Sequence, residues 1–245
     1  MMNETPQANP AVAEKLRSEI SEIEHAIDSG AYRPGPWAGL LTRARATSGA
    51  DRLAISADVT RVSRKLHLRG GRKTISAQTG VTSEAAAIGL GYFLLTLGVY
   101  ISSNAVAIAG AALWVMAFQP VVKVATGTAL GVGYDYVYLE RGEPRFKMEY
   151  GSYLARTRWA RIALHLSGAI GSPLGAYLAA MLAHDRLSVT YWVAMTAFWG
   201  VNVINLGLLL AGVAGIKRVG SYRSYRTVDT SCGAAGAEVR EALGR

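Results

Sequence analysis

Residues 161–183 read RIALHLSGAIGSPLGAYLAAMLA, and beyond Arg161 the stretch contains no aspartate, glutamate, lysine or arginine. A helix of about 20 residues, rising about 1.5 Å per residue, crosses the roughly 30 Å apolar core of a bilayer. Three further stretches are similarly apolar, at 85–101, 105–134 and 188–215, and Lys123 is the one charged residue within them. The sequence therefore predicts an all-α, polytopic membrane protein with four transmembrane helices and a cytosolic helical N-terminal region.

The composition agrees with this fold class. Hydrophobic residues make up 51% of the chain and charged residues 18%, and the two classes are segregated along the sequence. The stretch 105–134 is longer than one straight crossing requires, so we expect this helix to tilt, bend or continue past the lipid.

The placement of lysine and arginine predicts the orientation in the membrane. The short turns at 102–104 and 184–186 contain only one of these residues, Arg186, whereas the other connections are rich in them. Both termini are therefore predicted to be cytoplasmic, and the protein to be a multi-pass protein of the plasma (inner) membrane. Arginine far outnumbers lysine, which favours a bacterial source.

The spans divide the chain into four regions. Residues 1–9 are predicted to be a disordered tail, and 10–78 a cytosolic helical region that ends in a basic juxtamembrane helix. The transmembrane domain covers 79–216. Residues 217–245 are predicted to be a basic, largely disordered cytosolic tail.

An apolar stripe runs along a predicted helix from Pro10 to about residue 29, because apolar residues recur there every three or four positions. Such a stripe has to be buried against something. We favour burial on neighbouring cytosolic segments, while contact with a protein partner or a second copy through residues 10–30 stays open. The stripe consists of Val12, Leu16, Ile20, Ile23 and Ile27.

A basic amphipathic helix is predicted at about 50–68. Basic residues flank its apolar stripe of Ile55, Val59, Val62 and Leu66, which is typical of helices that lie among anionic lipid headgroups. The alternative is a solvated helix that packs on its neighbours and leaves its charges free. Since the net charge of +9 gathers beside the membrane, we assign it to anionic lipid and expect no nucleic acid partner. The predicted surface-binding residues are Arg61, Arg64, Lys65, Arg69, Arg72 and Lys73.

The connection at 134–159 mixes aromatic and charged residues. Tyr134, Tyr136 and Tyr138 alternate with other residues, and turn signals follow at Gly142 and Pro144. Aromatic rings suit the membrane interface, so an interfacial anchor is the favoured interpretation. A structured loop that binds a ligand or partner is the alternative.

Small residues at every fourth position of the third span predict close helix packing, because lipid supplies no hydrophobic drive for helix association. They place this span at the centre of the bundle, with dimerisation as the alternative use. The helix-packing residues are Ser167, Gly171, Gly175 and Ala179.

Polar residues within the spans suggest a cytosol-facing pocket. Pro120 frees the carbonyl of Met116 from its helical hydrogen bond, and broken helices with nearby polar groups build midplane sites. Each polar residue also has a structural alternative: a snorkelling lysine, a structural histidine or asparagines that tie helices together. The candidate pocket residues are Gln119, Lys123, His165, Asn202 and Asn205.

The sequence contains no recognisable catalytic or metal motif, neither HExxH nor GxxxxGK[ST], and we expect no cofactor. The single cysteine, Cys232, can form no intrachain disulfide. The leading hypothesis is a non-enzymatic scaffold, assembly or complex-subunit protein with a cytosolic interaction region. The rival is a membrane enzyme or carrier for a lipid or small amphiphile. It would use the polar pocket together with Asp135, Glu140, Glu143 and Glu149.

Overall fold

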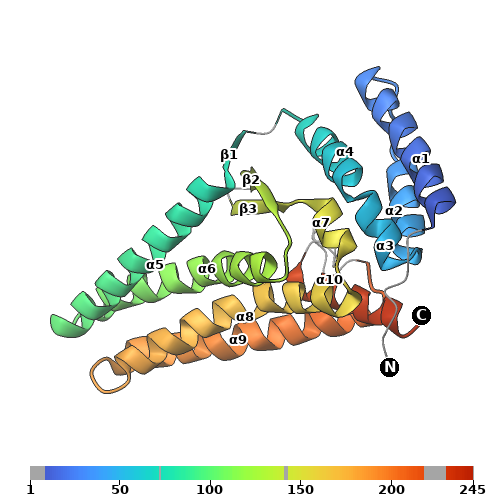
Figure 1. Cartoon of the computed structure of the whole chain (residues 1–245). Helices are drawn as coiled ribbons and strands as arrows, with labels where there is room; N and C mark the ends of the chain where they lie inside the picture. The colour runs from blue at the N-terminus through green and yellow to red at the C-terminus, as the bar shows by residue number, and fades with distance from the viewer. Residues whose placement is uncertain (1–8, 72, 141–142, 218–229, 245) are drawn as a thin grey trace, which may run out of the picture. The chain divides into compact units, whose positions relative to one another are not determined.

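A computed structural model of the protein describes residues 9–71, 73–140, 143–217 and 230–244 (Figure 1). Within these residues the chain forms ten helices and three short strands. It divides into two compact units, which we treat separately. The first unit comprises residues 1–76 and 131–157, and the second comprises 77–130 and 158–245.

The described part of the first unit contains the sheet and five helices, and the second contains the four longest helices together with α10. The first unit has α1 (Pro10–Asp28), α2 (Pro36–Ala46), α3 (Gly49–Ala54), α4 (Ser56–Leu68), α7 (Tyr150–Ala155), β1 (Thr74–Ser76), β2 (Tyr134–Glu140) and β3 (Glu143–Met148). The second has α5 (Ala77–Tyr100), α6 (Asn104–Ala129), α8 (Arg158–Ala183), α9 (Ser188–Val213) and α10 (Ser231–Ala242).

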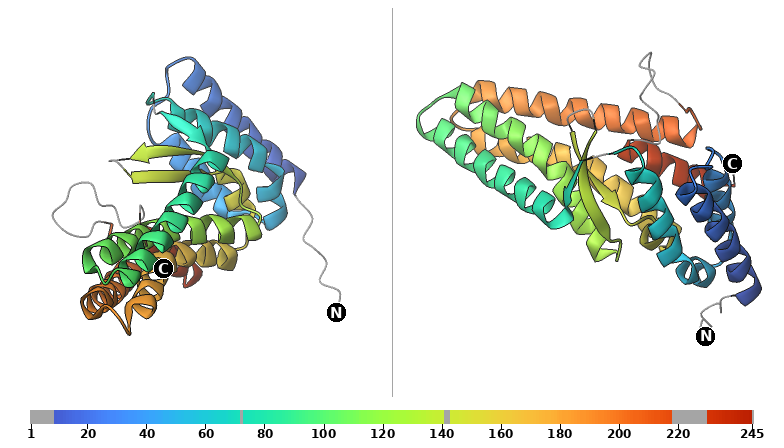
Figure 2. Two further views of the ribbon diagram at one scale, coloured as in Figure 1. Left: turned by 90° about the vertical axis from the view of Figure 1, so that its left-hand side faces the viewer. Right: turned by 90° about the horizontal axis from the view of Figure 1, so that it is seen from above.

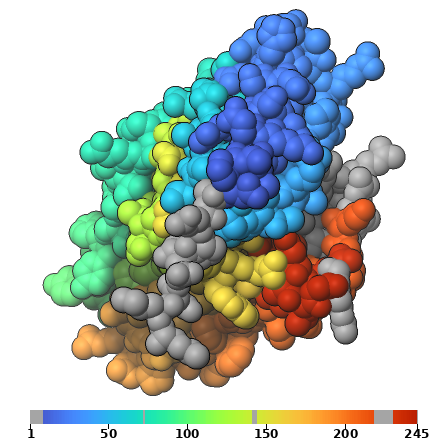
Figure 3. Space-filling view, turned by 45° about the vertical axis from the view of Figure 1, so that its right-hand side comes forward, coloured from blue at the N-terminus to red at the C-terminus, as the bar shows by residue number. Residues whose placement is uncertain are grey.

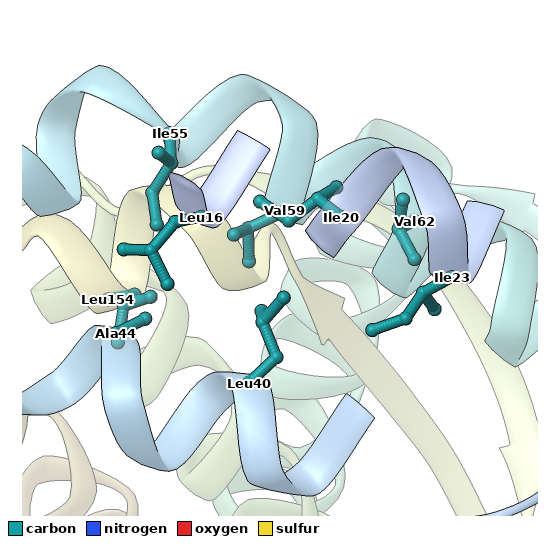
Figure 4. Close-up of a cluster of buried hydrophobic side chains, with 9 residues drawn as sticks. All are labelled: Leu16, Ile20, Ile23, Leu40, Ala44, Ile55, Val59, Val62 and Leu154. Atoms are coloured by element: carbon teal, nitrogen blue, oxygen red, sulfur yellow. The ribbon is translucent and has the colours of Figure 1, made fainter. Parts of the chain in front are cut away.

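Helix α1 buries its apolar stripe inside the first unit, as the favoured interpretation required. The helix begins at Pro10 because the Asn9 side chain accepts a hydrogen bond from the Ala11 N–H (3.1 Å) and proline suits the first turn. The rest of the predicted tail, residues 1–8, lies outside the described residues. Figure 4 shows the core that results, built from Leu16, Ile20, Ile23, Leu40, Ala44, Ile55, Val59, Val62 and Leu154.

The stripe of α4 lies in this same core, which corrects the expectation that it rests among lipid headgroups. Ile55, Val59 and Val62 have no exposed surface, and Leu66 packs against the cluster. Apolar side chains buried in a protein core cannot at the same time enter a bilayer. Any lipid binding by α4 must therefore rest on its charges alone.

Some charges of α4 are paired. The alternative interpretation, a helix that packs on its neighbours and leaves its charges free, is therefore corrected as well. Arg61 donates to Glu24 of α1 (Nη2–Oε2, 3.0 Å), and Lys65 donates to Asp28 (Nζ–Oδ2, 2.7 Å) and contacts Glu24 (Nζ–Oε1, 2.8 Å). The hydrogen bonds from Arg61 and Lys65 lower the pKa of the Glu24 carboxyl. These pairs tie α4 to α1 across the surface of the unit.

A three-stranded antiparallel sheet in the order β1-β2-β3 replaces the predicted loop (Figure 2). Ile75 pairs with Val137, and Val137 pairs with Phe146. The fold is all-helical in class, as predicted, and this small sheet is an addition that the loop prediction did not include. The alternation of tyrosines from Tyr134 to Tyr138 is the period-two signal of a strand.

Helices α4 and α7 fix the sheet and its neighbouring turn within the first unit. Lys147 of β3 donates to the Ser63 hydroxyl (3.1 Å), and His67 Nδ1 lies 2.8 Å from the Tyr136 hydroxyl. The Gly151 N–H of α7 donates to Thr60 Oγ1 (3.0 Å). A side chain at Gly151 would collide with the Ser56 carbonyl, so only glycine permits this approach.

In the second unit, α5, α6, α8 and α9 are long and apolar enough to cross a membrane, as predicted. They fit a multi-pass membrane protein by length and composition. Helix α6 ends at Ala129 rather than near 134, because Gly131 adopts a φ of +73° and β2 starts at Tyr134. The surplus length of the second apolar stretch therefore belongs to a turn and a strand.

Helix α8 is the most enclosed of the four. Half of its apolar window is buried, against 6–28% in the other three. A Cβ on Gly171 would lie 2.5 Å from the Gln119 Cα, and one on Gly175 would lie 2.7 Å from the Trp114 carbonyl oxygen. The glycines of the small-residue stripe thus pack against the backbone of α6 inside the unit.

The C-terminal segment departs most from expectation. We expected little order after Lys217, but residues 231–242 form α10, which packs against α8 and α9 (Figure 1). The Thr230 side chain caps the helix by accepting a hydrogen bond from the Gly233 N–H (3.1 Å). Residues 218–229 lie outside the described residues, so the prediction for them stands untested.

Candidate functional site

The polar residues predicted inside the spans mostly bridge helices. Gln119 of α6 accepts a hydrogen bond from Ser172 of α8 (3.4 Å). Asn205 of α9 donates to the Ala169 carbonyl of α8 (2.8 Å), whereas Asn202 donates to the Phe198 carbonyl of its own helix (2.9 Å). Gln119 and Asn205 thus tie α8 to its neighbours, as the structural alternative for the asparagines expected of Asn205, whereas Asn202 bonds only within its own helix.

Lys123 is the exception, because its partner is α10. Its Nζ donates to the Ser231 hydroxyl (3.3 Å), and its Cδ would lie 3.0 Å from a Cβ on Gly168 of α8. Ser231 is also the first residue of α10. The lysine therefore meets α8 and the end of α10 at one place.

His165 lies on the same face of α8. Its side chain is buried, and it sits four residues after Arg161 and three before Gly168, the spacing that puts residues on one side of a helix. The structure thus brings Lys123 and His165 towards one face of α8. Gln119, Asn202 and Asn205 instead join other parts of the bundle.

An ion pair that the sequence analysis missed dominates this face. Arg161 donates from Nε to both Glu238 oxygens (3.1 Å each) and from Nη2 to Oε2 (2.9 Å). The two side chains are only 3% and 4% exposed. Arg158 lies 4.0 Å from Glu241 one turn further along. Glu238 and Glu241 at i and i+3 were the only sequence signal for this pairing.

Glycines let α10 approach α9 closely. A Cβ on Gly212 would collide with the Gly233 carbonyl and lie 3.0 Å from the Gly236 Cα, and one on Gly236 would lie 2.8 Å from the Val213 N. This is backbone-to-backbone packing of the kind that small residues permit between membrane helices.

A second candidate site is a cleft of about 490 Å³ in the first unit. It lies between the start of α4, the start of β2 and the start of α7. The hydroxyls of Thr60 and Ser152 already accept backbone N–H groups there. The residues that line it are Ser56, Ala57, Thr60, Arg61, Arg64, Asp135, Glu149 and Ser152.

The charges in this cleft are unequally engaged. Arg61 is paired with Glu24 and Asp58. Within the described residues, however, no hydrogen bond or ion pair joins the carboxylates of Asp135 and Glu149 to another side chain. Arg64 contacts the ring of Tyr136 (6.0 Å to its centre). The cleft therefore offers two carboxylates and a guanidinium to a ligand.

Two other carboxylates of the rival hypothesis lie elsewhere. Glu140 pairs with Arg145 (3.4 Å), and the side chain of Glu143 lies outside the described residues. Only Asp135 and Glu149 of the four come together. Among the described residues, no three histidine, cysteine, aspartate or glutamate side chains are grouped as metal ligands.

The predicted lipid-binding residues have separate environments. Arg61 and Lys65 are held in ion pairs, and Arg69 donates to the Gly30 carbonyl (3.4 Å) and lies over Tyr32. Lys73 is exposed, and Arg72 lies outside the described residues. Anionic lipid binding by this set remains a prediction.

Comparison of the chain with known protein families, with curated proteins and with solved structures finds no match.

Proposed function

We propose that the chain is a non-enzymatic, multi-pass protein of the bacterial inner membrane that serves as a scaffold or complex subunit. Its first unit is the cytosolic interaction region, and both termini are cytoplasmic. The observation that carries this proposal is the distribution of polar groups. Polar side chains in the spans hold helices together, while unpaired charge gathers in the cleft of the first unit.

The partner class follows from the charges of the cleft. Asp135 and Glu149 together outnumber Arg64, so the cleft favours a polypeptide that presents a basic side chain beside an acidic one. The apolar stripe of α1 is buried, so contact through residues 10–30 is limited to its polar face. That helix lies on the surface of the space-filling view (Figure 3), with Glu14, Lys15 and Glu22 exposed.

A site-specific crosslink tests the partner proposal. A photoreactive residue at Ala57, in the cleft, should give one discrete adduct in intact cells. Asp135→Lys and Glu149→Lys should each abolish that adduct, because the reversed charge repels a basic partner. The same photoreactive residue at Lys15 of α1 is the matched control, and its adducts should not change. An Ala57 adduct that survives both substitutions would refute the cleft as the partner site.

Reporter fusions test the orientation. A reporter active only outside the cytosol should be silent after Arg245 and active when inserted at Ser103, because the basic residues flank the opposite ends of the spans. A strong signal after Arg245 would reverse the topology. The first unit would then lie outside the cytosol.

The rival, a membrane enzyme or carrier for a lipid or small amphiphile, has one observation in its favour: Lys123 of α6 approaches α8 at Gly168, one turn from the buried His165. Lys123→Met separates the two proposals. A scaffold should retain its cleft adduct and its cellular function. A carrier or enzyme should lose function at normal expression.

A further inference from the structure

Helices α10 and α8 are antiparallel and in register. Ser231 lies at Gly168, Glu238 at Arg161 and Glu241 at Arg158. Moving from Ser231 to Glu241 along α10 therefore moves ten residues back along α8. The two helices run side by side for about 15 Å at the usual helical rise.

This register gives α10 a depth in the membrane. If α8 crosses a roughly 30 Å apolar core, its residue Gly168 lies about 10 Å beyond Arg161. The first turn of α10 would then lie within the leaflet on the Arg158 side. Its contacts with Gly212 near the end of α9 agree with that placement.

The composition of α10 does not explain how it stays there. Its sequence, SCGAAGAEVREA, contains one large aliphatic residue, Val239. A helix of this kind has little apolar surface to hold it in lipid. The ion pairs and the glycine contacts must therefore retain it.

The surface that α10 covers is cationic. Arg158 and Arg161 project from α8, Lys123 approaches from α6, and the His165 imidazole lies on the same face. Helix α10 supplies this surface with two carboxylates, Glu238 and Glu241, and with the Ser231 hydroxyl. Helix α10 therefore covers three cationic side chains on one side of α8.

We propose that this cationic surface is a binding site for the anionic headgroup of an amphiphile, and that Glu238 is an internal competitor for it. The Arg161 guanidinium donates three hydrogen bonds to the Glu238 carboxylate. The same planar set of N–H donors suits the carboxylate or phosphate of a ligand. An amphiphile would place its head at Arg161 and its tail in the surrounding lipid. Its binding displaces α10. This proposal is independent of the cleft in the first unit.

The native cysteine reports the displacement. Cys232 is the only cysteine in the chain, and it is 4% exposed in the first turn of α10. A small maleimide should therefore react slowly while α10 is docked and rapidly once it leaves. No cysteine has to be introduced.

The first experiment uses the wild-type chain in phosphatidylcholine nanodiscs. Oleate should accelerate maleimide labelling of Cys232 about tenfold, as expected when a ligand favours the open state by that factor. Oleyl alcohol, which has the same chain and no charge, should leave the rate unchanged. Discs with phosphatidylglycerol distinguish the sources: acceleration there indicates a phosphate headgroup, and acceleration by oleate alone a fatty acid. Equal rates under all conditions would overturn the proposal.

Two variants separate competition from a structural role. Glu238→Gln removes the competing charge, so oleate adducts in native mass spectrometry should increase about tenfold, and Cys232 should react rapidly without ligand. Arg161→Gln should also expose Cys232 but abolish the oleate adducts. If the ion pair only stabilised the fold, the two variants would bind oleate alike. Equal binding by both variants would therefore refute the site, whatever the labelling rates.

Discussion

Arg161 of α8 and Glu238 of α10 form an ion pair with three hydrogen bonds, although 77 residues separate them in the chain. Both side chains are almost completely buried. Burying two charges is unfavourable, and only their mutual geometry offsets this. Removing one partner leaves the other charge buried without compensation.

Glu238→Ala should therefore lower the free energy of unfolding by about 3–5 kcal/mol. Exchanging both partners, Arg161→Met with Glu238→Leu, should recover most of this loss because no charge is left buried. Thermal unfolding in detergent micelles measures both variants. Glu241→Ala is the control, because its 4.0 Å contact with Arg158 is partly exposed and such pairs contribute about 0–1 kcal/mol. A loss for Glu238→Ala no larger than for Glu241→Ala would contradict the prediction.

Gly171→Ala should destabilise the second unit by about 1–3 kcal/mol, since the added methyl meets the α6 backbone at Gln119. Gly207→Ala is the matched control on α9, where a Cβ has no other atom within 4 Å. It should be neutral or slightly stabilising, because alanine is the better helix former. The comparison uses the same melting assay. If both variants melt alike, α6 does not pack on α8 as described.

The sequence predicted the four long helices because twenty apolar residues have few other stable environments. It also predicted the stripe of α1, yet the similar stripe of α4 was assigned to the membrane. Periodicity shows that Val59 and Val62 are buried, but not whether lipid or protein covers them. The flanking basic residues decided that assignment, and two of them, Arg61 and Lys65, pair with acidic residues of α1, distant in sequence.

Helix α10 was missed for a related reason. Its small residues resemble a linker, and its stability comes from contacts with Arg161 and Gly212 that no local pattern reveals. The candidate pocket stays a prediction for the same reason. Spacing predicted the depths of Lys123 and His165, but the helix that covers them could not be inferred.

The stability of the first unit should fall in acid through Glu24. Its pKa is lowered in the folded state by Arg61 and Lys65, so its contribution is complete above the unfolded-state pKa of about 4.3. The contribution is lost as the pH falls through the lower folded-state value. Hydrogen exchange of α1, corrected for intrinsic rates, should show weaker protection below about pH 4.

Glu24→Gln should remove about 1 kcal/mol at pH 7 and flatten this part of the pH dependence. Glu14→Gln is the control, because Glu14 is 79% exposed and its contact with Arg17 is long, at 4.0 Å. Its pH profile should match that of the wild type. If Glu24→Gln leaves the acid-dependent loss of α1 protection unchanged, that loss belongs to another carboxylate.

The binding of anionic lipid should depend on those basic residues that are not held in ion pairs with carboxylates. Arg64 and Lys73 are exposed, and within the described part of the chain Arg69 contacts a carbonyl and a ring, whereas Arg61 and Lys65 are paired with carboxylates. Each basic group near an anionic surface contributes about 1 kcal/mol, and salt screens it. The combined variant Arg64→Gln, Arg69→Gln and Lys73→Gln should co-purify with less phosphatidylglycerol, with the difference shrinking as salt rises. The paired variant Arg61→Gln with Lys65→Gln should retain the wild-type amount. The opposite result would mean that these ion pairs open at the membrane and that the folded arrangement of α1 and α4 is not the lipid-bound one.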